Sequence, residues 1–434
     1  MKVVIVGASF AGIHCAVKIK ELHPAFEVIV IEKKKQIAYI PSGLSMVLND
    51  EVMSLDEAYF TTKKKVEQLG VEIYTETEVL AYQFQDKQLI TSKGKFCYDK
   101  LVLATGSSQK SAKMFDEEEK VLTYKDKMSA QNILEKLAEV TEVVVVGAGQ
   151  AGMELASGLI HQEKKVQMIE TMDYPLYKYF DKDFLKSFYQ EVGQLESLSF
   201  HFNETVKEID GDKLVLSSGK EMPIKNKLVL SANSVRPDLK VFHHQLKSNS
   251  DNTVYVDDYL ETSMKDVFAI GDLIQVPSFL LKANIYAPLI VNAVQTSLTC
   301  AKNIERRQEK IQPMIKTVGI KLFDVYLAST GLMESESFLY DGQIHSRMMS
   351  VPLSTIHSKE MMIKVVYDKD SYVLLGVQLM SKESILDKIN TFALMIKERV
   401  DVRDMYRLPQ YYNAIFSSTS LDAFGLFEEG ADWS

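Results

Sequence analysis

The first 32 residues constrain the fold of this chain more strongly than any other stretch. Residues 2–6 form an apolar, β-branched run that is typical of a buried parallel strand. The turn GASFAG follows at residues 7–12, then a predicted helix over 13–22 and a second predicted strand over 27–31, which ends at Glu32. A strand, a glycine turn, a helix, a strand and an acid in this register predict a dinucleotide-binding βαβ unit.

Each position in this unit has a physical role. Gly7 permits the tight turn, and Gly12 lets the helix pack close to the strand. Ser9 replaces the middle glycine of the fingerprint, but it is small enough for the backbone to approach phosphates. The helix N-terminus offers free N–H groups and a positive dipole end to a pyrophosphate. Glu32 can accept hydrogen bonds from an adenosine ribose.

A second unit of the same design begins at residue 142. The segment EVVVVGAGQAG carries all three glycines, a predicted helix covers 153–161, and a predicted strand over 165–169 ends at Glu170. Two such units predict two bound nucleotides. An acid at Glu170 would repel a 2′-phosphate, so this unit is expected to prefer NADH over NADPH.

Two residues of the second unit have alternative interpretations. Glu154 either stabilises the first helical turn through its charge or lies beside the nicotinamide. Tyr179, in the aromatic loop after Glu170, either covers the adenine or packs in the core.

Composition limits the remaining possibilities. A chain of 434 residues favours two or three domains, and a net charge of −9 disfavours nucleic-acid binding. No apolar run is long enough to predict a membrane span, and no metal-binding motif is present. Cys15, Cys97 and Cys300 are each expected to be buried structural residues in a reducing compartment, so the protein is predicted to be cytoplasmic.

Further motifs follow in a fixed order. A predicted strand ends at Ala104-Thr105-Gly106, and another runs into a glycine and an acid at Gly271-Asp272. A helix is predicted from the segment around Pro288 to about residue 304, with Pro288 in its first turn. Residues 317–326, 346–354, 361–367 and 373–380 alternate like strands, and 383–399 reads as an amphipathic helix.

Taken together, these motifs resemble those of the pyridine nucleotide-disulfide oxidoreductases. The likeness covers nearly the whole chain and is strongest to the branch of NADH oxidase, NADH peroxidase and coenzyme A disulfide reductase. The resemblance implies an α/β fold with two Rossmann-like domains and a C-terminal α+β dimerisation domain. The predicted FAD-binding domain covers 1–112 and 246–310, the NAD-binding domain 113–245 and the dimerisation domain 311–434. FAD on the first fold, NADH on the second and a homodimer are expected.

The resemblance also assigns site residues. The FAD contacts are expected at Gly7, Ser9, Ala11, Gly12, Glu32, Lys33, Ser42, Val79, Ala104, Thr105, Gly106, Asp272, Ala287, Pro288 and Leu289. The NAD contacts are expected at Gly147, Gly149, Gln150, Ala151, Gly152, Glu170, Tyr179 and Ser234.

Two residues depart from the branch. Ser42 stands where relatives carry a redox cysteine, and Phe10 stands where peroxide-reducing relatives carry a histidine. Ser42 alternatively acts only as a helix cap. A thiolate can form a sulfenic acid or a mixed disulfide, whereas a hydroxyl forms neither. Ser42 therefore argues against disulfide reduction and against cysteine-dependent reduction of O2 to water.

Three functions remain open at this stage. The first is an FAD-dependent NADH oxidoreductase that passes electrons directly to O2, forming peroxide, or to a quinone or another small acceptor. The second is a Cys-to-Ser variant of an NADH oxidase or a coenzyme A disulfide reductase. The third is a sensor that binds FAD and NADH with little turnover. In the first, Phe10, Ser42 and Glu154 would lie at the reaction site.

Overall fold

The computed structural model describes residues 1–109, 120–233, 235–242, 244–407 and 412–415. These residues form two compact units. The first unit contains residues 1–140, 228–277 and 283–314, and the second contains 141–227, 278–282 and the described residues from 315 onward. The predicted three-domain division is not tested by these units and stays a prediction.

A five-stranded parallel sheet lies at the centre of the first unit, in the order β16-β7-β1-β2-β3. Its strands are β1 (Lys2–Val6), β2 (Glu27–Ile31), β3 (Glu72–Tyr74), β7 (Lys100–Leu103) and β16 (Val267–Ala269). In the central strand β1, the side chains from Val3 to Ile5 are fully buried. A continuous apolar run of this kind suits a strand that is covered on both faces.

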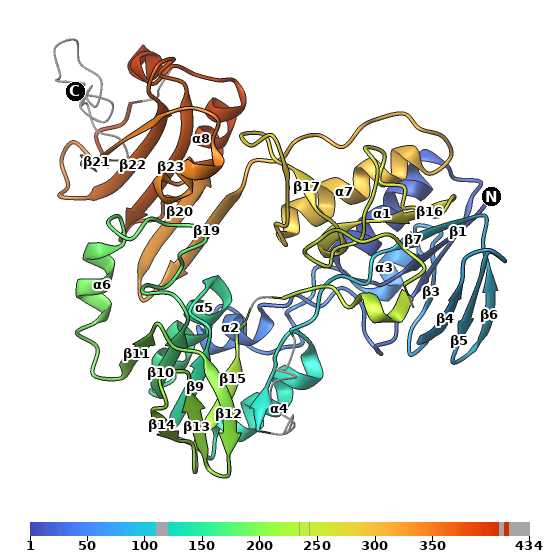
Figure 1. Ribbon diagram of the computed structural model, residues 1–434, viewed down its shortest axis with the longest axis horizontal. Helices are drawn as coiled ribbons and strands as arrows, with labels where there is room; N and C mark the ends of the chain where they lie inside the picture. The colour runs from blue at the N-terminus through green and yellow to red at the C-terminus, as the bar shows by residue number, and fades with distance from the viewer. Residues whose placement is uncertain (110–119, 234, 243, 408–411, 416–434) are drawn as a thin grey trace. The chain divides into compact units, whose positions relative to one another are not determined.

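Two long helices of the first unit pack against each other, as Figure 1 shows. α1 (Phe10–Leu22) buries Ile13, Ala16 and Ile19, which recur at helical spacing, and α7 (Ile290–Asn303) lies beside it. Shorter helical elements of this unit are α2 (Gly43–Leu48), α3 (Lys63–Glu67), α4 (Lys127–Leu137), η1 (Leu239–Phe242) and η2 (Gly271–Leu273).

Other strands of the first unit pair outside this sheet. β4 (Val79–Gln83), β5 (Gln88–Thr91) and β6 (Gly94–Cys97) form an antiparallel sheet. β8 (Val121–Leu122) pairs in parallel with β15 (Leu228–Ser231), and β17 (Val276–Pro277) pairs antiparallel with β18 (Asn284–Ile285).

The second unit begins with another parallel arrangement. β9 (Glu142–Val146) pairs with β10 (Lys165–Glu170), which pairs with β11 (Leu198–Phe202). α5 (Gln150–His161) connects β9 to β10, and α6 (Lys186–Val192) precedes β11. β12 (Val206–Asp210), β13 (Lys213–Leu216) and β14 (Glu221–Pro223) form a small antiparallel sheet. The predicted repetition of the opening βαβ design is therefore confirmed.

The rest of the second unit contains an antiparallel sheet in the order β19-β20-β23-β22-β21. Its strands are β19 (Thr317–Leu322), β20 (Val325–Gly331), β21 (Ile344–Pro352), β22 (Glu360–Asp368) and β23 (Leu374–Ser381). α8 (Lys388–Lys397) packs on β23 and β20, and the short helices η3 (Glu334–Leu339) and η4 (Val402–Arg407) follow β20 and α8. The predicted α+β character of this region is confirmed.

Several predicted element boundaries are wrong, and three of them have a clear physical reason. The single strand predicted over 317–326 is a hairpin, because Phe323 and Asp324 adopt positive φ angles of 47° and 67° and reverse the chain. The helix predicted from residue 383 begins at Lys388, since the backbone N–H of Glu383 donates instead to the Ser381 hydroxyl. Pro288 precedes α7 rather than lying in its first turn, because the N-cap Leu289 is extended.

The cysteine prediction is correct for two positions and wrong for one. Cys15 and Cys300 are fully buried in α1 and α7, whereas Cys97 is exposed at the end of β6. β6 is an edge strand of a small sheet, so one of its faces is open to solvent. None of the helices in the described ranges has the length and hydropathy required to span a bilayer.

Candidate functional site

The first glycine turn leaves no room for side chains at its two glycines. Gly7 has a φ of +110°, and a Cβ there would lie 2.3 Å from the carbonyl oxygen of Ala104. A Cβ on Gly12 would lie 1.9 Å from the carbonyl oxygen of Gly7. The turn after β1, the start of α1 and the end of β7 therefore meet at van der Waals distance, as the fingerprint predicts.

The acid at the end of the second strand holds this turn in place. Glu32 Oε2 accepts a hydrogen bond of 2.9 Å from the backbone N–H of Ala8, and Oε1 accepts one of 2.9 Å from the N–H of Lys34. Ser9 is the N-cap of α1, and its hydroxyl forms no capping hydrogen bond with this helix. The N-terminal amides of α1 therefore have no side-chain cap and stay the predicted position of a pyrophosphate.

The second glycine turn reproduces this arrangement in the second unit. Gly147 has a φ of +107°, and Glu170 Oε2 accepts a hydrogen bond of 2.7 Å from the N–H of Ala148. Glu170 Oε1 accepts from the Thr171 hydroxyl at 2.8 Å and from the N–H of Met172 at 3.0 Å. The carboxylate of Glu170 is only 5% exposed, so these donors replace lost hydration.

The loop that carries Ser42 is fixed to the first glycine turn. The N–H of Ala38 donates to the carbonyl oxygen of Ala8 at 2.8 Å, and Tyr39 forms a bridge with Tyr59. Ser42 is the N-cap of α2, but its hydroxyl forms no capping hydrogen bond. The interpretation of Ser42 as a simple side-chain cap is therefore wrong.

Phe10 belongs to an aromatic stack at the start of α1. Its ring centroid lies 4.2 Å from that of Phe60, and the Phe60 and His14 centroids are 5.5 Å apart. His14 Nδ1 lies 2.8 Å from the carbonyl oxygen of Phe10. The stack gives Phe10 a packing partner that the sequence did not predict.

Asp272 lies in a polar cluster that also contains residues missed by the sequence analysis. The Ser107 hydroxyl donates to Asp272 Oδ2 at 2.6 Å. Lys125 Nζ donates to the Ser107 hydroxyl at 2.7 Å and lies 3.6 Å from Asp272 Oδ2. Burial lowers the pKa of Lys125, although the charge of Asp272 opposes this effect. No sequence signal pointed to Lys125.

Two tyrosines with buried hydroxyls lie next to residues predicted to contact FAD. Tyr39 Oη lies 2.5 Å from the position of a Cβ on Gly43, immediately after Ser42, and Tyr286 precedes Ala287. The Tyr39 hydroxyl has no hydrogen-bond partner within the described part of the chain, whereas the Tyr286 hydroxyl lies close to Ser107 and Arg236, and burial raises the pKa of both tyrosines. A buried neutral hydroxyl without a partner, as in Tyr39, suits a ligand that offers acceptor atoms, so this part of the loop fits a bound FAD. The sequence could have indicated these two tyrosines through their positions close to predicted site residues.

The remaining FAD candidates all lie in the first unit. Ala11 is buried on α1 against Gly271, Lys33 is exposed after β2, and Val79 begins the edge strand β4. The other candidates lie in two loops, after β7 and before α7: Thr105, Gly106, Pro288 and Leu289.

The NAD candidates lie around the start of α5. Gly149 is its N-cap, and Gln150, Ala151 and Gly152 are its first residues. Glu154 is therefore the fifth residue of α5, and the prediction that it lies in the first turn is wrong. Gln150 Nε2 donates to Glu154 Oε1 at 3.0 Å. Ser234 lies outside the described residues.

Comparison with known proteins identifies the family. Residues 1–296 match the family model described as pyridine nucleotide-disulphide oxidoreductase. The chain belongs to this family.

Full-length relatives in the family agree with this assignment. An NADH oxidase of Enterococcus faecalis is 26% identical over 421 residues, covering 93% of this chain and 94% of the relative. A crystal structure of a pyridine nucleotide-disulfide family oxidoreductase from Enterococcus faecalis V583 is 31% identical, with a TM-score of 0.86 and 98% coverage of both chains. The water-forming NADH oxidase of Lactobacillus brevis, solved with NADH, shares the fold at a TM-score of 0.90, with 24% identity over 96% of this chain and 95% of that chain.

Membership of the pyridine nucleotide-disulphide oxidoreductases defines the class of activity. The chain is an enzyme, an NADH oxidoreductase that uses FAD and NADH. The predicted α/β fold with Rossmann-like sheets, the cofactors and the enzyme class are confirmed, and the dimerisation role of the C-terminal region stays a prediction. The roles of the individual site residues stay predictions.

Proposed function

We propose that this enzyme passes electrons from NADH through FAD directly to a small acceptor, without a redox cysteine. FAD, when bound, accepts a hydride from NADH and delivers two electrons to the acceptor. With O2, the overall reaction consumes NADH, a proton and O2 and yields NAD⁺ and hydrogen peroxide. A quinone is the alternative acceptor.

Ser42 is the observation that carries this proposal. Both glycine turns have the geometry for a dinucleotide, yet position 42 carries an oxygen where the resemblance places sulfur. Cys15 and Cys300 are fully buried in helices, and burial strongly raises the pKa of Cys300, so neither suits thiolate chemistry. Cys97 lies on β6, far from the glycine turn in sequence and in a different sheet from β1, the strand that leads into that turn.

The chain's own residues would bind and orient the cofactors. We assign the pyrophosphate of FAD to the N-terminus of α1, where Gly7, Ser9 and Gly12 allow close approach. Ser107 and Lys125 hold the Asp272 carboxylate, which we assign to the ribityl hydroxyls. In the second unit, the acid Glu170 supports NADH rather than NADPH, because a 2′-phosphate would meet a buried carboxylate.

An anaerobic reduction experiment tests the proposal. The FAD-loaded enzyme is mixed with NADH in a stopped-flow instrument, and the flavin absorbance is expected to bleach. Reoxidation with air is then expected to give one hydrogen peroxide per NADH consumed. Absence of bleaching with both NADH and NADPH would reject the proposal, and NADH oxidation by O2 without peroxide would reject the direct route to O2.

The same experiment separates the two alternatives. A sensor would bind both nucleotides tightly but show negligible turnover with O2, quinones and other acceptors. A Cys-to-Ser variant of a thiol-dependent enzyme is tested by Ser42→Cys. A large gain of water-forming oxidase or disulfide reductase activity in that variant would support this alternative over our proposal.

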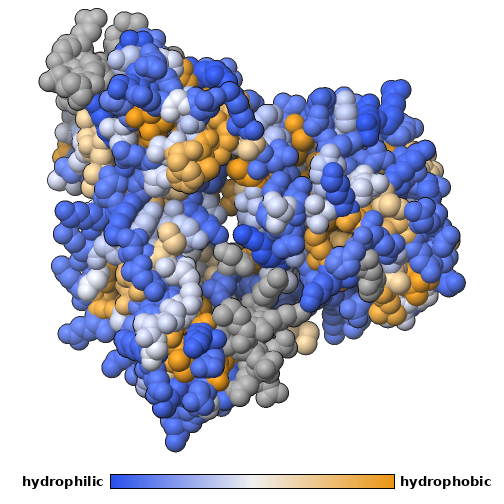
Figure 2. Space-filling model, in the orientation of Figure 1, coloured by the Kyte–Doolittle hydropathy of each residue, from blue (hydrophilic) through white to orange (hydrophobic). Residues whose placement is uncertain are grey.

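We also propose that the enzyme is a homodimer formed through its C-terminal region. Phe338, Ile356 and Leu394 are apolar side chains of this region that are 80%, 61% and 57% exposed. Apolar groups also gather over the C-terminal part of the face drawn in Figure 2. Sedimentation at micromolar concentration is expected to give the mass of two chains.

The cysteine content supports a reducing compartment, and we propose a cytoplasmic location on that ground.

A further inference from the structure

Lys364, on β22, is the basis of this inference because its side chain is only 1% exposed. Its Nζ lies 2.6 Å from Glu334 Oε2, 2.8 Å from Asp183 Oδ1 and 3.2 Å from Asp181 Oδ2. Burial lowers the pKa of Lys364, but the hydrogen bonds that its ammonium donates to Asp183 and Glu334 outweigh burial and raise it. Lys364 is therefore a buried cation surrounded by carboxylates.

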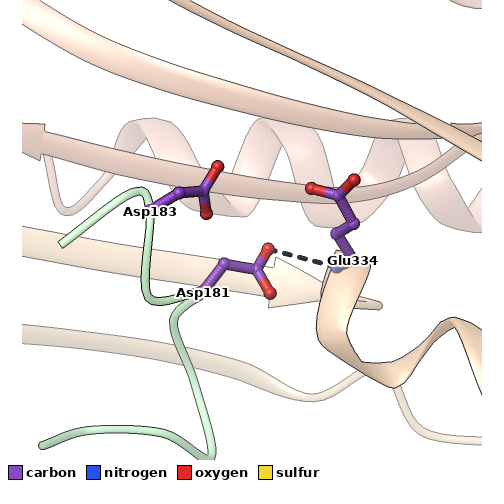
Figure 3. A group of neighbouring side chains, drawn as sticks. All are labelled: Asp181, Asp183 and Glu334. Carbon is purple, nitrogen blue, oxygen red and sulfur yellow. Dashed lines mark hydrogen bonds between the residues drawn. The ribbon is translucent and has the colours of Figure 1, made fainter. Parts of the chain in front are cut away.

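The three carboxylates come from two separate segments. In Figure 3, Asp181 and Asp183 project from the loop after β10, and Glu334 projects from the start of η3. Their oxygen atoms lie close enough to hold a metal ion, but the ammonium of Lys364 is within hydrogen-bond or ion-pair distance of all three. The positive charge of Lys364 thus offsets the repulsion among these three carboxylates.

Asp181 is fixed through both its backbone and its side chain. Its N–H donates to Gln378 Oε1 at 2.8 Å, and Gln378 Nε2 donates to Asp181 Oδ2 at 2.6 Å. The N–H groups of Glu334 and Ser335 donate to the same carboxylate at 3.1 and 2.9 Å. Removing the charge of Lys364 would leave this carboxylate buried without its cation.

The other end of the loop is fixed to the second glycine turn. The N–H of Leu176 donates to the carbonyl oxygen of Ala148 at 2.9 Å, and Leu176 is fully buried. The N–H of Ala148 in turn donates to Glu170, the acid expected to bind the ribose. The loop therefore runs from the predicted nucleotide site to the Lys364 cluster.

Tyr179 lies between these two anchors. Its N–H donates to the carbonyl oxygen of Leu176 at 2.9 Å, and its ring centroid lies 6.0 Å from Lys316 Nζ. Burial raises the pKa of Tyr179 to about 12, so the ring remains neutral. Because both ends of the loop are fixed, the position of the ring depends on both anchors.

We propose that Lys364 is a positioning residue for the NADH site, which holds the loop of residues 174–184 so that Tyr179 can cover the bound nucleotide. The inference rests on the proposed function, in which the second glycine turn binds NADH. Lys364 itself touches no nucleotide in this proposal. It acts through Asp181 and Asp183, the two acids of the loop, and its loss would let the acids separate and the loop relax away from the glycine turn.

The test uses Lys364→Met in the FAD-loaded enzyme, because methionine is unbranched, keeps most of the length of the side chain and removes its charge. The NAD⁺ dissociation constant is measured by calorimetry on the oxidised enzyme, and flavin reduction is measured anaerobically against NADH concentration. We expect the dissociation constant to rise by about ten-fold, equivalent to about 1.4 kcal/mol. The reduction rate at saturating NADH should stay within about two-fold of the parent enzyme, because the hydride-transfer geometry is not altered.

Two further variants keep the test decisive. Lys382→Met removes an exposed ion pair with Glu191, 2.6 Å long, in the same unit and should leave NAD⁺ affinity unchanged. The double variant Asp183→Asn, Glu334→Gln changes side chains that are 57% and 47% exposed, so it should fold even if Lys364→Met does not. We expect it to weaken NAD⁺ binding several-fold.

A purely structural role would give a different result. A folded, FAD-loaded Lys364→Met enzyme with a lowered melting temperature but parent-like NAD⁺ affinity would overturn the inference. If Lys364→Met does not fold, parent-like affinity in the double variant would overturn it equally. If the parent enzyme binds NAD⁺ but NADH never reduces its flavin, the proposed function fails, while the affinity comparison still decides the role of Lys364.

Discussion

At the residue scale, the acids after β2 and β10 have a structural role that precedes any contact with a nucleotide. Glu32 and Glu170 accept the N–H of Ala8 and Ala148, the second residue of each glycine turn. Each carboxylate thereby fixes the turn in the conformation that exposes the helix N-terminus. The same hydrogen bond in both units explains why the acid and the turn occur together in the sequence.

Gly12 gives the first testable prediction at this scale. Gly12→Ala places a Cβ 1.9 Å from a backbone oxygen, which cannot move as a flexible side chain would. We expect the free energy of unfolding to fall by about 1–3 kcal/mol, with loss of bound FAD. Chemical unfolding and flavin absorbance after gel filtration measure both effects. Gly149→Ala is the matched control, because within the described part of the chain nothing beyond its own neighbours lies within 4 Å of its Cβ position, and it should keep the parent FAD content.

Asp266 gives a prediction for pH dependence. Its carboxylate lies 2.6 Å from Lys87 Nζ and 2.7 Å from Lys100 Nζ. Burial acts to raise the pKa of Asp266, but hydrogen bonds from the two lysines outweigh burial and lower it. A lowered folded-state pKa gives stability that is complete above the unfolded-state pKa of about 3.9 and is lost as pH falls through the folded-state value.

Asp266→Asn should therefore destabilise the protein in a pH-dependent way. We expect a loss of about 1–2 kcal/mol at pH 7 that shrinks as the pH falls below about 4. Asparagine tolerates the positive φ of 64° at this position, so backbone strain is not introduced. Urea unfolding across this range measures the difference, and a difference that stays constant with pH would contradict the prediction.

At the element scale, the C-terminal sheet depends on a tight hairpin between β19 and β20. The turn places two consecutive residues, Phe323 and Asp324, at positive φ without using glycine. Its register is continuous from the Leu322–Val325 pair to the Thr317–Thr330 pair. The turn conformation therefore sets which side chains of both strands face the core.

Asp324 allows this turn to be tested with little effect on packing, because its side chain is 93% exposed. Asp324→Val should lower the free energy of unfolding by about 1–2 kcal/mol, since a β-branched residue is strained at positive φ. Asp324→Gly should be neutral or slightly stabilising. Asp324→Asn serves as the control for loss of the exposed Lys321 ion pair. Equal stability of the valine and asparagine variants in thermal unfolding would refute the role assigned to this turn.

At the scale of the whole molecule, the proposed activity assigns electron storage to the flavin alone. Relatives with a cysteine at the position of Ser42 would have a second redox group, but a hydroxyl cannot cycle between thiol and disulfide. Anaerobic titration of the FAD-loaded enzyme with dithionite should therefore end at two electrons per flavin. An end point of four electrons would show that another group, such as a cysteine pair, takes part.

The sequence by itself determined the two βαβ units, their acids and the family resemblance, because these features depend on residues close together in the chain. Local patterns also located most strands. They misplaced the hairpin at Phe323 and the start of α8, where single residues decide between continuing and reversing the chain. Boundaries of this kind depend on backbone angles that composition does not specify.

Only the tertiary structure brought distant residues together. Lys364 meets Asp181 across 183 positions of sequence, and Lys125 reaches Asp272 across 147. Neither lysine is part of a motif, because an ion pair needs only opposite charges at short distance and leaves no spacing to detect. The sequence therefore predicts which groups are expected to contact the nucleotides, and only the fold shows which charged side chains pair with acids far away in the chain.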